Sequence, residues 1–367
     1  TKVLKLENYK DSIFYKNILL FLYISLYFFL QSKFPHMESK IKIAPVLFFK
    51  RTNPPVFIIS AIIMLVFILA VTLFTEVSKI FFDSIQLIII EKFSWIFTVS
   101  TVLFLVLVMF LLLSRFGSIR LSSTNEEPEF GYVTWFAMMF SAGMGIGLVF
   151  WSIAEPIKHF IKPPLIEPVT ITPVDQAISV TFFHWGFHAW AIYVMVGLCL
   201  AYFSFRKGLP LTIRSCFYPL LGNKIYGRWG HCIDIFAVVG TMFGVATSLG
   251  LGAMQINSGL NFIGDCPETK LTQIALIALI TLFATVSVVL GLKKGVSRLS
   301  YFNVMMSVIL LVFVFILGPT LFIVNTFEEG LKNYLSNIIY FSYWSEWVAT
   351  TEWKANWTIF YWGWWIA

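Results

Sequence analysis

Charged residues are scarce in this sequence. They make up 12% of its 367 residues, against about a quarter in soluble domains, whereas 58% of the residues are hydrophobic. This balance excludes an ordinary soluble protein and predicts a chain that crosses a membrane several times. The net charge of +7 does not indicate nucleic acid binding, because the basic residues form short clusters between apolar runs. Such clusters are typical of the cytoplasmic loops of membrane proteins.

Cysteine is also rare. The four cysteines form no CxxC pair and have no metal-like spacing with the five histidines, so neither a disulfide framework nor a zinc site is indicated. His184 and His188 lie four residues apart on one predicted helix. No acidic or cysteine partner accompanies them, and we expect them to form hydrogen bonds between helices rather than to bind metal. No constellation of acid, base or metal ligands is recognisable, so we expect that the protein is not an enzyme.

Long apolar runs occupy most of the chain. Seven reach the about 20 residues that a membrane crossing needs, and an eighth begins at Thr358. The seven are 56–74, 93–113, 132–154, 177–205, 233–260, 271–292 and 303–324. Basic clusters follow the second, fourth and sixth runs, so the positive-inside rule places the N-terminus in the cytoplasm. Glu155 and Lys158 are assigned to a loop of mixed charge after the third run.

The two ends of the sequence carry their own predictions. Met37 opens a lysine-bearing leader, so we expect residues 1–36 to be upstream read-through, with a lipid-lying anchor as the alternative. The chain stops at Ala367, about ten residues into the eighth run, which is too short for a crossing. We therefore expect a fragment that does not transport alone, either cropped from a longer protein or made from a disrupted gene.

Gly143, Gly145 and Gly147 alternate inside the third apolar run. Each glycine lowers helical stability and lets the backbone unwind, which predicts a broken membrane helix with a ligand or ion site near mid-membrane. The alternative is that small residues let a neighbouring helix pack closely. The glycines alone leave both interpretations open.

Aromatic residues gather in two places. Trp185, Trp190 and Tyr193 lie within an arc of about 140° on the fourth predicted helix, where three ring faces could hold a cation. The alternative is a belt of aromatic residues at the membrane interface. The same ambiguity applies to the three tryptophans of the eighth run, Trp362, Trp364 and Trp365.

Polar residues also occur in the fifth apolar run and in the segment 327–353. Thr241, Thr247 and Ser248 in the fifth run could coordinate a small hard cation, although hydroxyls more commonly donate to carbonyls of their own helix. Residues 327–353 carry Leu331 and Leu335 at helical spacing, opposite charged residues. This pattern predicts an amphipathic helix along the outer membrane face.

Four motifs in order resemble the betaine/carnitine/choline transporter family, over nearly everything from Pro54 onward. They are SAGMGIGLVFWSIAEP at 141–156, FHWGFHAWAIY at 183–193, GLPLTIRS at 208–215 and WTIFYWGWW at 357–365. The resemblance implies an all-α polytopic membrane protein with two leading helices and two inverted repeats, like the leucine transporter, and a homotrimer. The segments would be an N-terminal segment 1–53, two leading helices 54–130, a first repeat 131–326, an amphipathic surface helix 327–356 and the start of an incomplete second repeat 357–367.

The resemblance also implies site residues. The aromatic box would be Trp185, Trp190, Tyr193 and Trp365, with Trp362 and Trp364 close by, beside the unwound segment of Gly143, Met144, Gly145 and Gly147. Carbonyls of Ser141 and Met144 would bind sodium. Thr241 is a further candidate sodium ligand, and sodium is the one cofactor considered. Sodium-coupled members have a second threonine where this chain has Val245, so we expect coupling to one sodium ion or to protons.

The implied function is secondary active transport of a small quaternary ammonium compatible solute in the bacterial inner membrane, serving osmoprotection. Family members that take choline often carry an aspartate at the position of Gly147, so glycine betaine ranks first, before choline, carnitine and ectoine. The competing classes are a channel, a membrane enzyme and a non-functional product of a disrupted gene.

Overall fold

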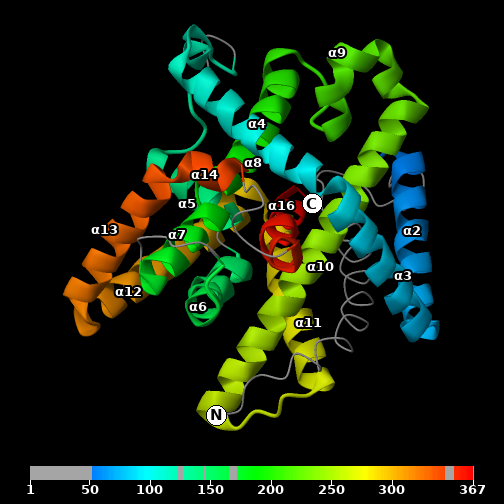
Figure 1. The fold of residues 1–367 in the computed structure, drawn as a ribbon. Helices are drawn as coiled ribbons and strands as arrows, with labels where there is room; N and C mark the ends of the chain where they lie inside the picture. The colour runs from blue at the N-terminus through cyan, green and yellow to red at the C-terminus, as the bar shows by residue number, and fades with distance from the viewer. Residues whose placement is uncertain (1–51, 123–126, 144, 165–171, 344–350, 367) are drawn as a thin grey trace. The chain divides into compact units, whose positions relative to one another are not determined.

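The computed structural model describes residues 52–122, 127–143, 145–164, 172–343 and 351–366, and every regular element in these ranges is a helix (Figure 1). Within them, six helices are long and apolar enough to cross a membrane, or seven if the two halves of one broken pair form a single span. The chain is therefore an all-α polytopic membrane protein. The predictions for residues 1–36, for Met37 and for Ala367 lie outside the described residues.

The helices have the following bounds in chain order. They are α2 (Pro54–Leu73), α3 (Thr75–Ile88), η3 (Ile89–Phe93), α4 (Ser94–Leu113), η4 (Arg115–Ser118), α5 (Tyr132–Gly143), α6 (Ile146–Ile161), α7 (Pro173–Trp185), α8 (Phe187–Ala201), η5 (Tyr202–Arg206), η6 (Ile213–Phe217), α9 (Tyr218–Leu221), η7 (Gly222–Tyr226), α10 (Arg228–Gly264), α11 (Lys270–Val289), η8 (Leu292–Val296), α12 (Ser297–Leu317), α13 (Thr320–Ser336), α14 (Ile338–Tyr343), α15 (Thr351–Lys354), η9 (Ala355–Ile359) and α16 (Phe360–Ile366). The η elements are 3₁₀ or π helices.

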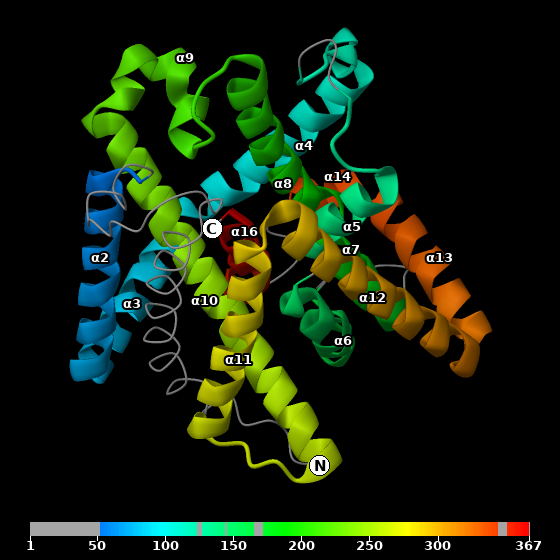
Figure 2. The same cartoon turned by 180° about the vertical axis from the view of Figure 1, so that it is seen from behind.

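The chain divides into two compact units. The first comprises the described parts of 1–79, 128–148 and 223–307. In it, α10 packs against α2 and α11, as Figures 1 and 2 both show. Phe67 of α2 meets Phe243 of α10 edge to face, with ring centroids 4.7 Å apart, beside the buried Met64. Aromatic pairs in this geometry add to the stability that burial supplies.

The second unit comprises the described parts of 80–127, 149–222 and 308–367. Its core lies where α7 packs against α13 and α8 packs against α4. A Cβ on Gly330 of α13 would lie 2.4 Å from Ile178 Cγ2, so glycine is what allows this close approach. Ser179 Oγ donates to the Gly330 carbonyl at 3.3 Å, which further joins the two helices.

The fourth predicted helix is one candidate membrane span, Pro173–Arg206, with a local interruption at Gly186. The sequence predicts one helix over 177–205, but α7 ends at Trp185 and α8 begins at Phe187. Tyr334 Oη accepts a hydrogen bond from Phe187 N at 3.1 Å and so satisfies an amide at the start of α8. Gly186 sits at the break, where a Cβ would lie 2.4 Å from the Phe182 carbonyl.

The amphipathic segment begins earlier than predicted. The seventh run was expected to span 303–324, but α12 ends at Leu317 and α13 starts at Thr320, before position 327. Leu331 and Ile338 pack against the core of the second unit, whereas Leu335 is 45% exposed. Residues 344–350 of the predicted surface helix lie outside the described part.

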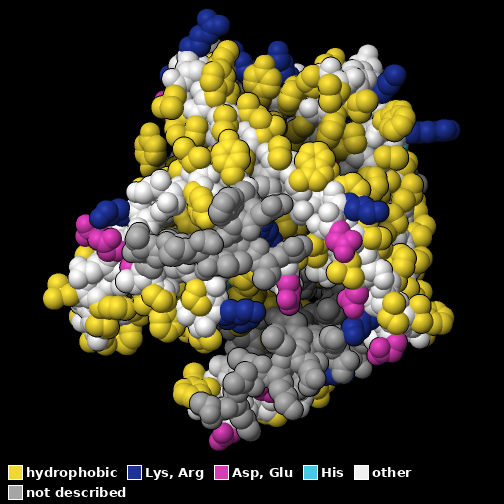
Figure 3. Space-filling view, in the orientation of Figure 1, with side chains coloured by type: hydrophobic (Ala, Val, Ile, Leu, Met, Phe, Trp, Pro, Cys, Tyr) yellow, Lys and Arg dark blue, Asp and Glu magenta, His cyan; other side chains and the backbone are white. Residues whose placement is uncertain are grey.

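Apolar side chains also cover the surface. Much of the face in Figure 3 that is not grey is hydrophobic, with few charged side chains among the apolar ones. Exposed leucine, isoleucine, valine and phenylalanine are frequent along α2, α4 and α12. Such surfaces are expected of helices whose solvent is lipid.

Candidate substrate and ion sites

The glycine-rich segment interrupts a membrane helix. α5 ends at Gly143 and α6 begins at Ile146, with Gly145 between them, Gly147 in the first turn of α6 and Met144 outside the described residues. The two helices together form either the predicted broken span or a re-entrant loop. A Cβ at Gly145 would meet nothing within 4 Å among the described residues, so close helix packing does not explain this glycine. The break frees backbone amides and carbonyls, which need partners from protein, water or a ligand.

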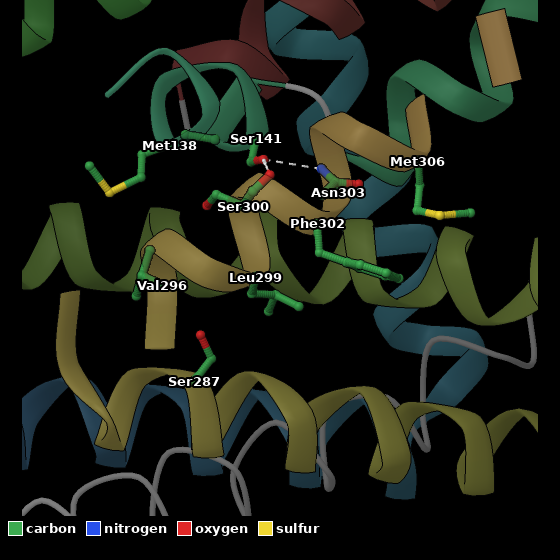
Figure 4. A pocket seen from close by; sticks show the side chains of 10 residues that line it. Met138, Ser141, Ser287, Val296, Leu299, Ser300, Phe302, Asn303 and Met306 are labelled. Carbon is green, nitrogen blue, oxygen red and sulfur yellow. Dashed lines mark hydrogen bonds between the residues drawn. The ribbon is translucent and has the colours of Figure 1, made fainter. Parts of the chain in front are cut away.

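Ser141, one of the predicted sodium ligands, lies in the last turn of α5. Its Oγ donates to the Ser300 carbonyl at 3.3 Å and accepts from Asn303 Nδ2 at 3.2 Å (Figure 4). The three residues line a pocket of about 580 Å³ between α5, α11 and α12, with Ser287 and Met138 also on its wall. The pocket is therefore polar on the side of Ser141.

Thr241, the other described candidate ligand, forms a hydrogen bond within its own helix. Its Oγ1 donates to the Ala237 carbonyl at 2.8 Å, and Thr247 Oγ1 donates to Phe243 O at 2.9 Å. Hydroxyl groups in helices commonly donate to a carbonyl of their own helix in this way. A hydroxyl that donates its proton keeps lone pairs for a cation, so the assignment of Thr241 stays a prediction.

Most of the predicted aromatic residues meet in the second unit. Trp185 contacts Trp365 edge to face, with ring centroids 4.9 Å apart and ring planes at 86°. Tyr193 lies 5.5 Å from Trp365, and Trp190 lies 5.8 Å from Tyr193. Trp364 stacks on Trp365 at 5.6 Å. We call these five rings the aromatic cluster.

The aromatic cluster combines α7 and α8 with α16, which is distant in sequence. A belt at the membrane interface does not require rings of distant segments to touch, so these contacts favour a cluster over a belt. Trp190 is 40% exposed and Tyr193 is 38% exposed, so one side of the cluster is open.

Trp362 is not part of this group. It is 1% exposed and packs against Phe183, with ring centroids 5.3 Å apart, and against His188 at 6.1 Å. Trp362 and Trp365 are three residues apart, but their contacts are with different residues. Trp362 therefore stabilises the core of the second unit.

Glu155 lies inside a helix and not in the predicted loop. It was assigned to a loop after residue 154, but α6 continues to Ile161 and buries Glu155 completely. Pro156 inside α6 removes one helical hydrogen bond without ending the helix. A buried carboxylate needs several hydrogen bonds or a counter-charge, and Glu155 lies within hydrogen-bond distance of four side chains.

Four side chains surround this carboxylate. His184 Nδ1 lies 2.5 Å and His159 Nε2 lies 3.2 Å from Glu155 Oε1. Trp185 Nε1 and Tyr361 Oη each donate to Oε2 at 2.7 Å. Because a carboxylate only accepts hydrogen bonds, the two histidine nitrogens that face it carry protons. We call these five residues the Glu155 network.

Two contacts connect the network to its surroundings. His184 Nε2 lies 3.0 Å from Thr358 Oγ1 in η9, so both nitrogens of the imidazole have partners. The ammonium group of Lys158 lies over the rings of Trp151 and Trp357, 5.4 Å and 5.6 Å from their centroids. This aromatic pair thus already holds a cation of the chain itself.

The expected hydrogen bonds of the histidines between helices are confirmed. His188 Nε2 lies 2.8 Å from Ser342 Oγ in α14, and His184 reaches Glu155 and Thr358. The statement that no acidic residue accompanies the histidines is wrong, because Glu155 comes from α6. The signal available was Glu155 itself, which follows an apolar run and lies four residues before His159.

Comparison with known proteins identifies the class of this fold. The model of the betaine/carnitine/choline family transporters matches residues 55–367, so the chain belongs to the betaine/carnitine/choline transporter family. Members of this family are transporters rather than enzymes.

Several curated relatives are similar over most of this chain. A probable glycine betaine transporter of Desulfitobacterium hafniense is 44% identical over 87% of this chain and 63% of its own length. A glycine betaine transporter of Acinetobacter baylyi is 42% identical, covering 87% and 48%. The high-affinity choline transport protein of Escherichia coli is 40% identical, covering 86% and 47%. The chain thus spans about half to two thirds of the length of these relatives.

Proposed function

We propose that the protein is a secondary active transporter of a small quaternary ammonium solute, with glycine betaine ranked first. The observation that carries this proposal is the aromatic cluster, in which Trp185, Tyr193 and Trp365 converge from α7, α8 and α16. A methylated ammonium group is weakly hydrated and is attracted to ring faces, each worth about 0.5–2 kcal/mol. The names of relatives as betaine and choline transporters support the same solute class.

Solute binding requires the cluster to open. Trp185 and Trp365 are in direct ring contact at 4.9 Å, which leaves no space for a trimethylammonium group between them. Trp190 and Tyr193 are partly exposed in the present arrangement. In this proposal the solute first binds the rings of Trp190 and Tyr193. It then enters between Trp365 and Trp185, and the separated rings enclose the solute.

A free donor in the cluster favours betaine over choline. The indole Nε1 of Trp365 is buried and has no hydrogen-bond partner among the described residues. A carboxylate is the natural acceptor for such a donor, since a buried unpaired N–H costs about 1–3 kcal/mol. Betaine carries a carboxylate and choline does not. Choline remains the second candidate, because relatives such as the Escherichia coli protein transport it by name.

The coupling ion, location and assembly of the protein complete the proposal. The solute is coupled to one sodium ion or to protons, with Ser141, Met144 and Thr241 as the sodium candidates. The protein lies in a bacterial inner membrane, as expected from its bacterial relatives, with its N-terminus in the cytoplasm. It forms a homotrimer, as the family resemblance implies. Carnitine and ectoine rank behind betaine and choline.

Counterflow of labelled glycine betaine in proteoliposomes that contain the full-length protein tests this function. A carrier loaded with unlabelled betaine accumulates label transiently, whereas a channel only equilibrates it. We expect transient accumulation that unlabelled betaine inhibits better than choline does. No counterflow would overturn the transporter assignment, and far stronger inhibition by choline would overturn the ranking of solutes.

A further inference from the structure

The Glu155 network contains a buried anion without a fixed positive partner. Glu155 and His184 are 0% exposed and His159 is 1% exposed. Among the described residues, the ion pairs of Glu155 are with these two histidines. With both imidazoles neutral, the network holds a net negative charge inside the protein, which is costly. One added proton makes it neutral.

His184 is placed to hold that added proton. Its Nδ1–H donates to Glu155 in either protonation state, while its Nε2 faces the hydroxyl of Thr358. When Nε2 is bare, the hydroxyl donates to it, and when Nε2 is protonated, the hydroxyl turns and accepts from it. Both states therefore keep every polar atom of His184 paired. A purely structural histidine needs only one of these states.

The network is joined directly to the aromatic cluster. Trp185 donates to Glu155 Oε2 through Nε1, and its ring contacts Trp365. Tyr361 also donates to Oε2 and lies one helical turn before Trp365 in α16. A change in charge at Glu155 thus alters the hydrogen bonds that position two rings beside the solute. Ionisable residues inside membrane proteins commonly serve as proton relays.

We propose that Glu155 and His184 form the site of a proton that is transported together with the solute. This inference rests on the proposed function and names its coupling ion. In this proposal, solute binding separates Trp365 from Trp185. The displaced Trp185 then donates a weaker hydrogen bond to Glu155, and a carboxylate that loses a donor takes up a proton more readily. Linkage is reciprocal, so protonation favours solute binding by the same factor.

Other titratable groups lie around this site. His159 shares Oε1 with His184, and Lys158 on the same helix lies over the rings of Trp151 and Trp357. His188 comes from α8. Tyr361 comes from α16. α15, whose Trp353 ring lies 5.8 Å from that of His184, also bears Glu352 and Lys354.

A divalent metal ion is the competing occupant. Ligand atoms of Glu155, His159 and His184 all lie within 4.8 Å of one another. The hydrogen bonds favour the proton, because both histidine nitrogens that would bind the metal already donate to Glu155 Oε1. A metal would have to displace both of these protons.

The test uses the full-length protein in sodium-free proteoliposomes. We measure accumulation of labelled betaine under an inward proton gradient, betaine-driven proton uptake with a pH-sensitive dye, and counterflow without a gradient. The variants are Glu155→Gln and His184→Asn. The asparagine keeps a hydrogen-bond donor near the position of Nδ1 but cannot hold the added proton. His188→Gln is the matched control, since His188 is equally buried but contacts Ser342 and Tyr334 instead.

We expect the wild type and His188→Gln to accumulate betaine with proton uptake. In Glu155→Gln and His184→Asn, gradient-driven accumulation should fall about tenfold or more relative to counterflow. A structural role would lower both activities together. The proposal is overturned if wild-type accumulation needs sodium and ignores the proton gradient, if both variants keep the wild-type ratio, or if a stoichiometric metal copurifies and is lost in His184→Asn. If the wild type shows counterflow but no proton coupling, the transporter assignment stands and only the proton site is refuted. If the wild type shows no counterflow, the transporter assignment itself is refuted.

Discussion

Trp185 donates its indole Nε1–H to the buried carboxylate of Glu155 at 2.7 Å. The same ring contacts Trp365 of the aromatic cluster at 4.9 Å. Glu155 can therefore position a ring of the aromatic cluster without touching the solute.

The first prediction concerns the hydroxyl of Tyr361, which is fully buried and donates to Glu155. Tyr361→Phe should lower the free energy of unfolding by about 1.5–3 kcal/mol, because a charged acceptor loses one of its donors. Thermal unfolding in detergent measures this. Tyr301→Phe is the control, since Tyr301 is 53% exposed and should change stability by less than about 0.5 kcal/mol. Equal shifts for both variants would contradict the role of Tyr361.

The second prediction compares two helix glycines. Gly330→Ala places a Cβ 2.4 Å from Ile178 Cγ2 and should destabilise the packing of α13 on α7 by about 1–3 kcal/mol. Gly259 in α10 has open space at its Cβ position, so Gly259→Ala should stabilise the protein by up to about 1 kcal/mol. Unfolding of both variants in the same detergent gives the comparison. Destabilisation of similar size in both would show that the contact with Ile178 is not what matters.

The third prediction concerns sodium. Val245 lies one turn after Thr241 in α10 and offers no side-chain oxygen to a hard cation. Betaine uptake by the full-length protein should therefore show either no sodium dependence or a sodium Hill coefficient of about one. A coefficient clearly near two would refute this. Val245→Thr adds the missing hydroxyl. A higher sodium Hill coefficient in this variant than in the wild type would support the view that Val245 removes a second sodium site.

Features encoded in local patterns could be predicted from the sequence. The first and sixth apolar runs, 56–74 and 271–292, closely match α2 and α11, because apolar length alone sets such spans. An interruption of the helix after Gly143 is one of the two interpretations that the alternating glycines allow. The convergence of Trp185 with Trp365 was expected from family motifs, and the structure places these rings in contact.

Features that depend on distant partners were missed. The break at Gly186 rests on Tyr334, which is 147 positions from Phe187 and supplies its amide with an acceptor. Charge usually marks the end of a membrane span, so the sequence alone places Glu155 in a loop. Its burial depends on donors from α7 and α16, which no local pattern reveals. The packing of Trp362 on Phe183 likewise joins residues that are distant in sequence.

The central claim is that the aromatic cluster binds the solute, and the affinity of labelled betaine for Trp365→Leu tests it most directly. Loss of one cation–π contact should weaken binding by about 2- to 30-fold, the factor that corresponds to about 0.5–2 kcal/mol. Trp95→Leu is the matched control, because Trp95 is 62% exposed in α4 and outside the cluster. The account predicts weaker binding for Trp365→Leu and for Trp190→Leu, with wild-type affinity for Trp95→Leu. Unchanged affinity in both cluster variants would contradict it.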